Sequence, residues 1–137
     1  MTDLFSLSAV GGELQVITLT VPMPDNIANS RMHWTRRMRI KQQYAKQLNE
    51  LQSIGIIPPP PAVPLPHVTV RSVMYLGGPM DDDNAVARHK PLLDWLKRAK
   101  YIVDDRRKCL RWEKFPEQVV RRNHQYRIEI TITETLG

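Results

Sequence analysis

Three stretches of the chain, residues 14–21, 67–76 and 125–134, alternate apolar and polar residues and are rich in β-branched side chains. Alternation with a period of two places the apolar side chains on one face of a β-strand. In the last stretch that face carries Ile128, Ile130 and Ile132. Residues 110–115 predict a further, shorter strand, so we expect about four strands in total.

Two stretches have the period of a helix instead. In the first, which begins at Trp34 and ends at Gly55, the positions that recur every three or four residues are Met38, Gln42, Ala45, Leu48 and Leu51. Residues 85–99 predict a second helix, but Pro91 lies inside it. Proline lacks the backbone N–H and crowds the preceding turn, so either the helix kinks near residues 87–90 or a new helix begins at Pro91. We expect the kink.

The order of these elements, β-α-β-α-β-β, predicts an α/β (α+β) fold: a single domain with a mixed sheet of about four strands and two main helices packed on it. A chain of 137 residues is the size of one domain. Residues 1–12 show no sustained period and are expected to form a flexible arm. Residues 58–66 are rich in proline and predict a stiff connector within the domain.

The charge of the chain favours nucleic acid as a partner. Lysine and arginine outnumber aspartate and glutamate by 20 to 14, which gives a net charge of +6. Five of the acids lie in two clusters, so the remaining surface is more basic than the net charge suggests: Asp81, Asp82, Asp83, Asp104 and Asp105. A basic body around an acidic spot suits the attraction of a polyanion and metal chemistry on it.

Cysteine content and hydropathy predict the compartment. A single cysteine, Cys109, excludes an internal disulfide, and no Cys/His cluster has the spacing of a zinc site. No stretch approaches the ~20 apolar residues of a membrane span, and the N-terminus lacks the pattern of a signal peptide. We therefore expect a soluble, cytoplasmic protein without membrane contact.

The densest candidate chemistry is the run Asp81-Asp82-Asp83-Asn84, which directly follows the strand predicted at residues 67–76. In an extended segment alternate residues face the same side, so Asp81 and Asp83 would converge while Asp82 turned away. Asn84 would then cap the next helix. Mg²⁺ prefers several oxygen ligands of this kind. The alternative is a solvated acidic turn; a calcium loop of EF-hand type is excluded because Ala85 and Val86 occupy a ligand position and the glycine position.

Basic residues gather in three places. One group crowds the start of the first helix, where positive charge opposes the helix dipole and therefore hints at phosphate contacts: Arg31, Arg36, Arg37, Arg39 and Lys41. The other two are Arg106-Arg107-Lys108 and Arg121-Arg122. All three could instead be solvated faces. We expect Trp34, Trp95 and Trp112 to serve core or dimer packing rather than base stacking.

The text DDDNAVARHKPLLDWLKRAKYIVDD, together with the strands LQVITLTVPMP and RIEITITE, resembles the RusA family of Holliday junction resolvases. The resemblance implies a homodimeric, Mg²⁺-dependent endonuclease that nicks four-way DNA junctions symmetrically. By position it makes Asp81, Asp83 and Asp105 the metal ligands and Lys90 the catalytic lysine. Asn84 and Asp104 would lie next to these ligands and contact them without binding the metal themselves.

One departure from the family pattern concerns the catalytic cation. The family's lysine follows the asparagine by three residues, whereas here AVARH separates Asn84 from Lys90. Three residues are close to one helical turn and shift a side chain by about 4.5 Å along the axis. Arg88 or His89 could therefore occupy the position of the lysine.

These residues predict the following activity. Mg²⁺, or Mn²⁺ as a substitute, would activate water and neutralise the leaving oxygen, and Lys90 would stabilise the transition state at the phosphate. We expect no small-molecule cofactor. The predicted DNA contacts are Arg36, Arg37, Arg39, Arg88, Arg106, Arg107, Lys108, Arg121 and Arg122. The alternative is a protein that binds branched DNA without cleaving it.

Overall fold

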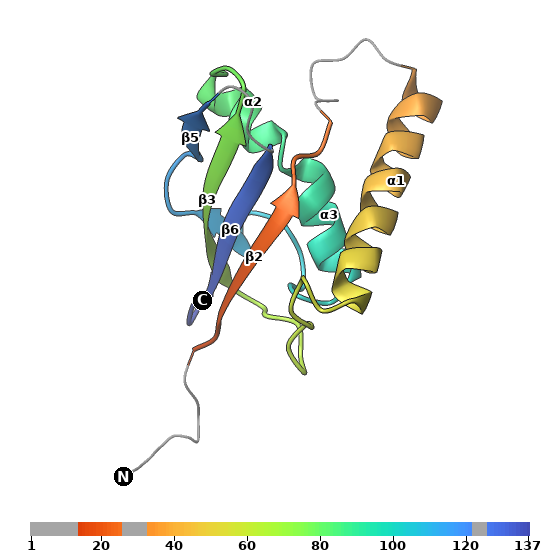
Figure 1. The fold of residues 1–137 in the computed structure, drawn as a ribbon. Coiled ribbons are helices and arrows are strands. Elements are labelled where there is room, and N and C mark those ends of the chain that lie inside the picture. Colours follow the sequence, from red (N-terminus) through yellow and green to blue (C-terminus); the bar gives the residue numbers. More distant parts are fainter. Residues whose placement is uncertain (1–13, 26–32, 122–125) are drawn as a thin grey trace.

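The computed structural model describes residues 14–25, 33–121 and 126–137, which form a single α/β domain (Figure 1). Its centre is a mixed five-stranded sheet. Strands β2 (Val16–Pro22), β6 (Arg127–Glu134) and β3 (Val68–Leu76) lie side by side in that order, and each pair is antiparallel. Strands β4 (Leu110–Trp112) and β5 (Glu117–Val120) pair in parallel with two successive parts of the other edge of β3.

The described residues form three helices. Helices α1 (Trp34–Ser53) and α3 (Lys90–Arg98) lie on one side of the sheet, and the short helix α2 (Asp82–Ala87) follows the end of β3 (Figure 1). Helix α1 ends at Ser53, and the predicted terminating glycine, Gly55, follows it with a φ of +86°, a conformation that favours glycine. No helix in these described ranges is both long and apolar enough to cross a membrane.

The core lies between the sheet and the two long helices. The predicted apolar face of β6 is confirmed, because Ile128, Ile130 and Ile132 are all buried. Alternate residues of the neighbouring strands join them: Leu19, Val21, Val70 and Met74. Helices α1 and α3 supply the opposite layer: Tyr44, Leu48, Leu92, Trp95 and Leu96. Strand alternation and helical period therefore meet in one continuous core.

Helices α1 and α3 are joined by side-chain contacts that fix the orientation of α3. The indole Nε1 of Trp95 donates to Asn49 Oδ1 at 2.8 Å, and Lys41 Nζ lies 3.5 Å from Asp94 Oδ2. The Tyr44 hydroxyl donates to the carbonyl of Pro22 at 2.7 Å, which ties α1 to the end of β2. Burial raises the pKa of Tyr44, so this hydroxyl remains a donor.

The proline-rich connector is anchored within the domain. Leu65 forms a parallel bridge with Ile102, through hydrogen bonds from Leu65 N to Tyr101 O and from Val103 N to Leu65 O. The Tyr101 hydroxyl donates to the carbonyl of Pro58. Both ends of residues 58–66 are therefore held by the segment that follows α3.

Two predictions about the elements are wrong. The sheet has five strands rather than about four: the predicted strand 110–115 stops at Trp112, and β5 was missed because four residues against one edge carry little alternation. The helix predicted over residues 85–99 is not one kinked helix but two. Pro91 lies in the first turn of α3, where its missing N–H costs no hydrogen bond. The predicted arm at residues 1–12, Arg31 and Arg122 lie outside the described residues.

Candidate functional site

The acidic run adopts a helical rather than an extended conformation. Asp81 is the residue before α2, with φ −63° and ψ 149°, and Asp82 and Asp83 occupy the first turn. Asn84 lies within the helix, so its predicted role as the N-cap is wrong. Asp82 and Asp83 are helical, and helical residues turn by about 100° each, so the strand alternation from which the convergence of Asp81 and Asp83 was predicted does not continue through the run. Their convergence on one metal ion stays a prediction. The negative charges suit the start of a helix.

Gln118 of β5 sets the position at which the chain leaves β3 for this run. Its side chain forms two hydrogen bonds of 2.9 Å with the backbone of Met80, one to the N–H and one to the carbonyl. Met80 directly precedes Asp81, so the carboxylates start from a fixed point beside the sheet. Gln118 was missed because a single glutamine in a short strand carries no sequence signal.

His89 holds the break between α2 and α3 against β3. Its side chain is fully buried, with Nδ1 2.7 Å from the carbonyl of Ala85 and Nε2 2.6 Å from Ser72 Oγ. A carbonyl only accepts, so Nδ1 carries the proton and the Ser72 hydroxyl donates to Nε2. Burial lowers the pKa of His89 to about 4. His89 is therefore neutral and occupied, and the idea that it replaces the catalytic lysine is wrong.

Arg88 is attached to the backbone that follows β2. Its Nε donates to the carbonyl of Pro24 at 2.9 Å, and about half of the residue is buried. Burial lowers the pKa of Arg88, while the charge of Asp25 opposes that change. This contact gives Arg88 a structural role at the end of the sheet; its predicted DNA contact remains a prediction.

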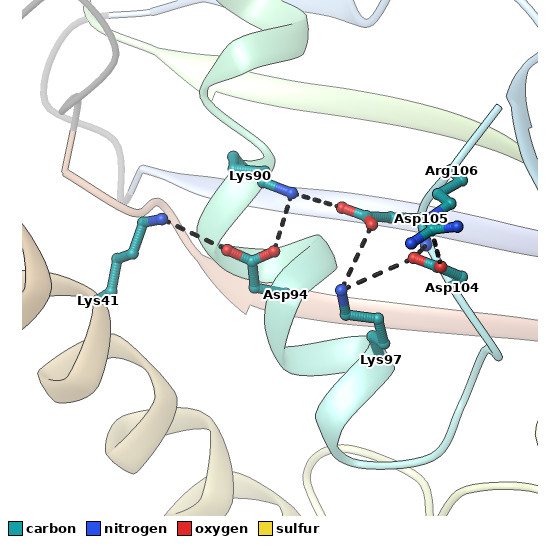
Figure 2. Close-up of polar contacts among 7 residues, drawn as sticks. All are labelled: Lys41, Lys90, Asp94, Lys97, Asp104, Asp105 and Arg106. Atoms are coloured by element: carbon teal, nitrogen blue, oxygen red, sulfur yellow. Dashed lines mark hydrogen bonds and ion pairs between the residues drawn. The ribbon is translucent and has the colours of Figure 1, made fainter.

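Lys90 is the candidate cation that reaches a predicted metal ligand. Its Nζ donates to Asp105 Oδ2 at 2.7 Å and lies 3.0 Å from Asp94 Oδ1 (Figure 2). The hydrogen bond to Asp105 is the main reason that the pKa of Lys90 is raised, so the ammonium keeps its charge. Asp94 was not predicted because it stands apart from the acidic clusters; its signal in the sequence is the interval of four residues from Lys90 on one helix.

Asp105 is the most enclosed of the predicted ligands, with its side chain 11% exposed. Lys97 Nζ lies 3.7 Å from both Asp105 Oδ1 and Asp104 Oδ1, and the Asp105 N–H donates to Asp104 Oδ1 at 2.7 Å. Burial raises the pKa of Asp105, but the hydrogen bond from Lys90 and the lysine charges outweigh it, so the pKa is lowered. Asp105 is therefore ionised and held by two lysines.

Positive and negative side chains alternate through this region (Figure 2). The chain of ion pairs runs through Lys41, Asp94, Lys90, Asp105, Lys97, Asp104 and Arg106. It joins α1, α3 and the segment after α3. Asp104 contacts Asp105, and Arg106 contacts Asp104. The supporting role of Asp104 at a metal site stays a prediction.

Trp112 lines two cavities, and a predicted metal ligand lines each of them. It borders a cavity of about 500 Å³ that is lined by Asp83, Val86, Lys114 and Phe115. It also borders a second cavity of about 540 Å³ that contains Asp105, Arg107 and Arg111. Lys114 and Arg111 were missed as candidate phosphate contacts, since neither belongs to one of the basic groups identified in the sequence.

Asp81 and Asp83 lie at the start of α2. Asp83 and Asp105 line different cavities, both of which Trp112 borders. Within residues 14–25, 33–121 and 126–137, no group of three or more His, Cys, Asp and Glu side chains is arranged to hold a metal ion. The arrangement brings Lys90 to Asp105 but does not gather the three carboxylates.

The other predicted residues occupy several parts of the surface. Arg36, Arg37 and Arg39 lie in the first turns of α1, and Lys108 and Arg121 are exposed on connecting segments. Among the tryptophans, Trp95 is a core residue as predicted, Trp112 is half-buried, and Trp34 is 68% exposed and so does not belong to the core.

Comparison of the chain with models of known protein families finds no match, and comparison with curated proteins finds no match either.

Proposed function

We propose that the protein is a Mg²⁺-dependent, RusA-like endodeoxyribonuclease that nicks branched DNA. The observation that carries this proposal is the 2.7 Å contact between Lys90 Nζ and Asp105 Oδ2. Fifteen residues separate the two along the chain, and the resemblance assigns both to one catalytic centre. In such a centre the carboxylate can hold a metal ion while the lysine stabilises negative charge at the phosphate.

The donor chemistry fits a hard divalent cation. Asp81, Asp83 and Asp105 would supply the carboxylate oxygens that Mg²⁺ prefers, and Mn²⁺ accepts the same ligands. Asp105 is already ionised, because the lysines lower its pKa. Lys90 and Lys97 compete with a cation for Asp105, so metal binding there involves displacement of at least one ammonium group.

The residues of the chain would divide the work as follows. Lys90 would place its charge beside the scissile phosphate and stabilise the negative charge that grows in the transition state. Arg107, Arg111 and Lys114 would hold neighbouring phosphates, because they line the two cavities that Trp112 borders. A bound Mg²⁺ would supply an activated water and neutralise the leaving oxygen.

Paired, symmetric nicks require two active sites related by a two-fold axis, and a homodimer is therefore part of the proposal. The alternative function is that of a protein that binds branched DNA without cleaving it. The three additional residues between Asn84 and Lys90, compared with the family pattern, favour this alternative.

A junction-cleavage assay tests the proposal. We expect the protein to make paired nicks in a labelled four-way junction with Mg²⁺, to make none after chelation of the metal, and to spare a linear duplex of the same sequence. Binding without nicking in either Mg²⁺ or Mn²⁺ would contradict the nuclease and support the alternative. Failure to bind the junction in preference to the duplex would contradict both.

The competition at Asp105 makes a separate prediction. Exchange of Lys90 for methionine should raise the affinity for Mg²⁺ about threefold, because it removes an ion pair of about 0.5–1 kcal/mol. Asp105→Asn should lower that affinity. Lys41→Met is the matched control, since Lys41 contacts Asp94 and not Asp105. Calorimetric titration measures the three affinities, and unchanged binding in Asp105→Asn would contradict its role as a ligand.

A further inference from the structure

The cavity beside Asp83 has aromatic walls that the proposed chemistry does not use. Trp112 and Phe115 line it together with Val86 and Lys114. Phe115 is 56% exposed, although it is a large apolar side chain. The ring of Trp112 and the buried ring of His89 make an edge contact, with the centroids 4.9 Å apart. The cavity is therefore lined by one half-buried and one exposed aromatic side chain.

The charges around this cavity suit an anionic chain that passes over it. Lys114 lines it, and Arg107 and Arg111 line the other cavity that Trp112 borders. Its volume of about 500 Å³ lies in the range of sites for small flat ligands. Aromatic walls with a cationic edge are the arrangement that binds an unstacked nucleobase and its phosphate, because every base has a π-face.

We infer that the cavity lined by Asp83, Val86, Trp112, Lys114 and Phe115 binds one unpaired nucleobase of a DNA strand. Trp112 and Phe115 stack on the base, and Lys114 contacts a phosphate of the same strand. Because Asp83 forms part of the wall, the nucleotide is placed next to the acidic run at the start of α2. The inference deepens the proposed function, and it favours substrates with unpaired bases at the branch.

The test measures binding of single-stranded and junction oligonucleotides with divalent cations chelated, so that cleavage plays no part. We expect Phe115→Ala to weaken binding about fivefold to a hundredfold, which is the range for loss of one stacked base. Phe115→Tyr retains the ring and should bind like the wild type. Ile54→Ala, which removes another exposed apolar side chain beyond the end of α1, should have no effect.

A second arm uses DNA in which one branch-point base is replaced by an abasic residue. The wild type should bind the abasic DNA more weakly than the intact DNA. For Phe115→Ala the abasic replacement should cause little further loss of affinity, because the substitution has already removed the same stacking contact. Equal binding by Phe115→Ala and wild type, or fully additive losses, would overturn the inference. So would a change in self-association of Phe115→Ala without a change in DNA binding. If the stacking predictions hold but the protein nicks no junction, only the proposed nuclease function is rejected. If the protein nicks junctions but Phe115→Ala binds DNA like the wild type, only the proposed base site is rejected.

Discussion

Replacement of Asp83 by asparagine should reduce junction nicking to below about one-thousandth of the wild-type rate, the size of effect expected when one member of a catalytic centre is lost. The physical reason is the loss of a charged metal ligand while the shape of the side chain is retained. Single-turnover cleavage of a labelled junction measures the effect. Binding of the junction should persist, because asparagine removes a negative charge that repels DNA.

Asp82→Asn is the matched control for this substitution. Asp82 and Asp83 are neighbours in the first turn of α2, and both are exposed. Each exchange removes the same charge from the same helix end, so the effects on stability should be equal and at most about 1 kcal/mol. Asp82→Asn should keep most of the activity. Equal loss in both variants would contradict the assignment of Asp83 and indicate a general electrostatic effect.

Acidification should destabilise the protein by about 3 kcal/mol between pH 6.5 and pH 4 through His89 alone. Burial lowers the pKa of His89 from 6.5 to about 4 in the folded protein. In this window the unfolded chain binds more protons than the folded one, so stability is full above pH 6.5 and declines as the pH falls toward 4. Urea unfolding at several pH values measures the decline.

His89→Gln separates the contribution of His89 to the pH dependence of stability from that of other titrating groups. Glutamine can still donate to the carbonyl of Ala85, but it does not titrate, so the slope of stability against pH should flatten in this window. The ionised Asp105 also contributes to stability, because its pKa in the folded protein is lowered from the ordinary value. That contribution is lost only as the pH falls below the ordinary pKa of an aspartate. An unchanged slope in His89→Gln would show that the imidazole is not the group responsible.

Much of the fold could be predicted because its elements carry strong periods. The isoleucines of β6 alternate over eight residues, and the helical period of α1 extends over twenty, so both were found close to their observed bounds. The weak elements were not. Strand β5 has four residues, and its place is decided by its pairing with residues 73–76 of β3. Pro91 marked a disturbance, but only the packing of α3 decided that a new helix begins there.

The candidate site was predicted in its residues and not in its geometry. The sequence by itself determined the two acidic clusters, the lysine between them, the basic surplus and the strands that carry them. The tertiary structure decided that Lys90 contacts Asp105, that His89 is buried between Ser72 and Ala85, and that Asp83 and Asp105 line different cavities beside Trp112. The reason is physical: period and composition record local preference, whereas these contacts join residues from different elements, and their distances depend on how α3, β3 and β4 pack together.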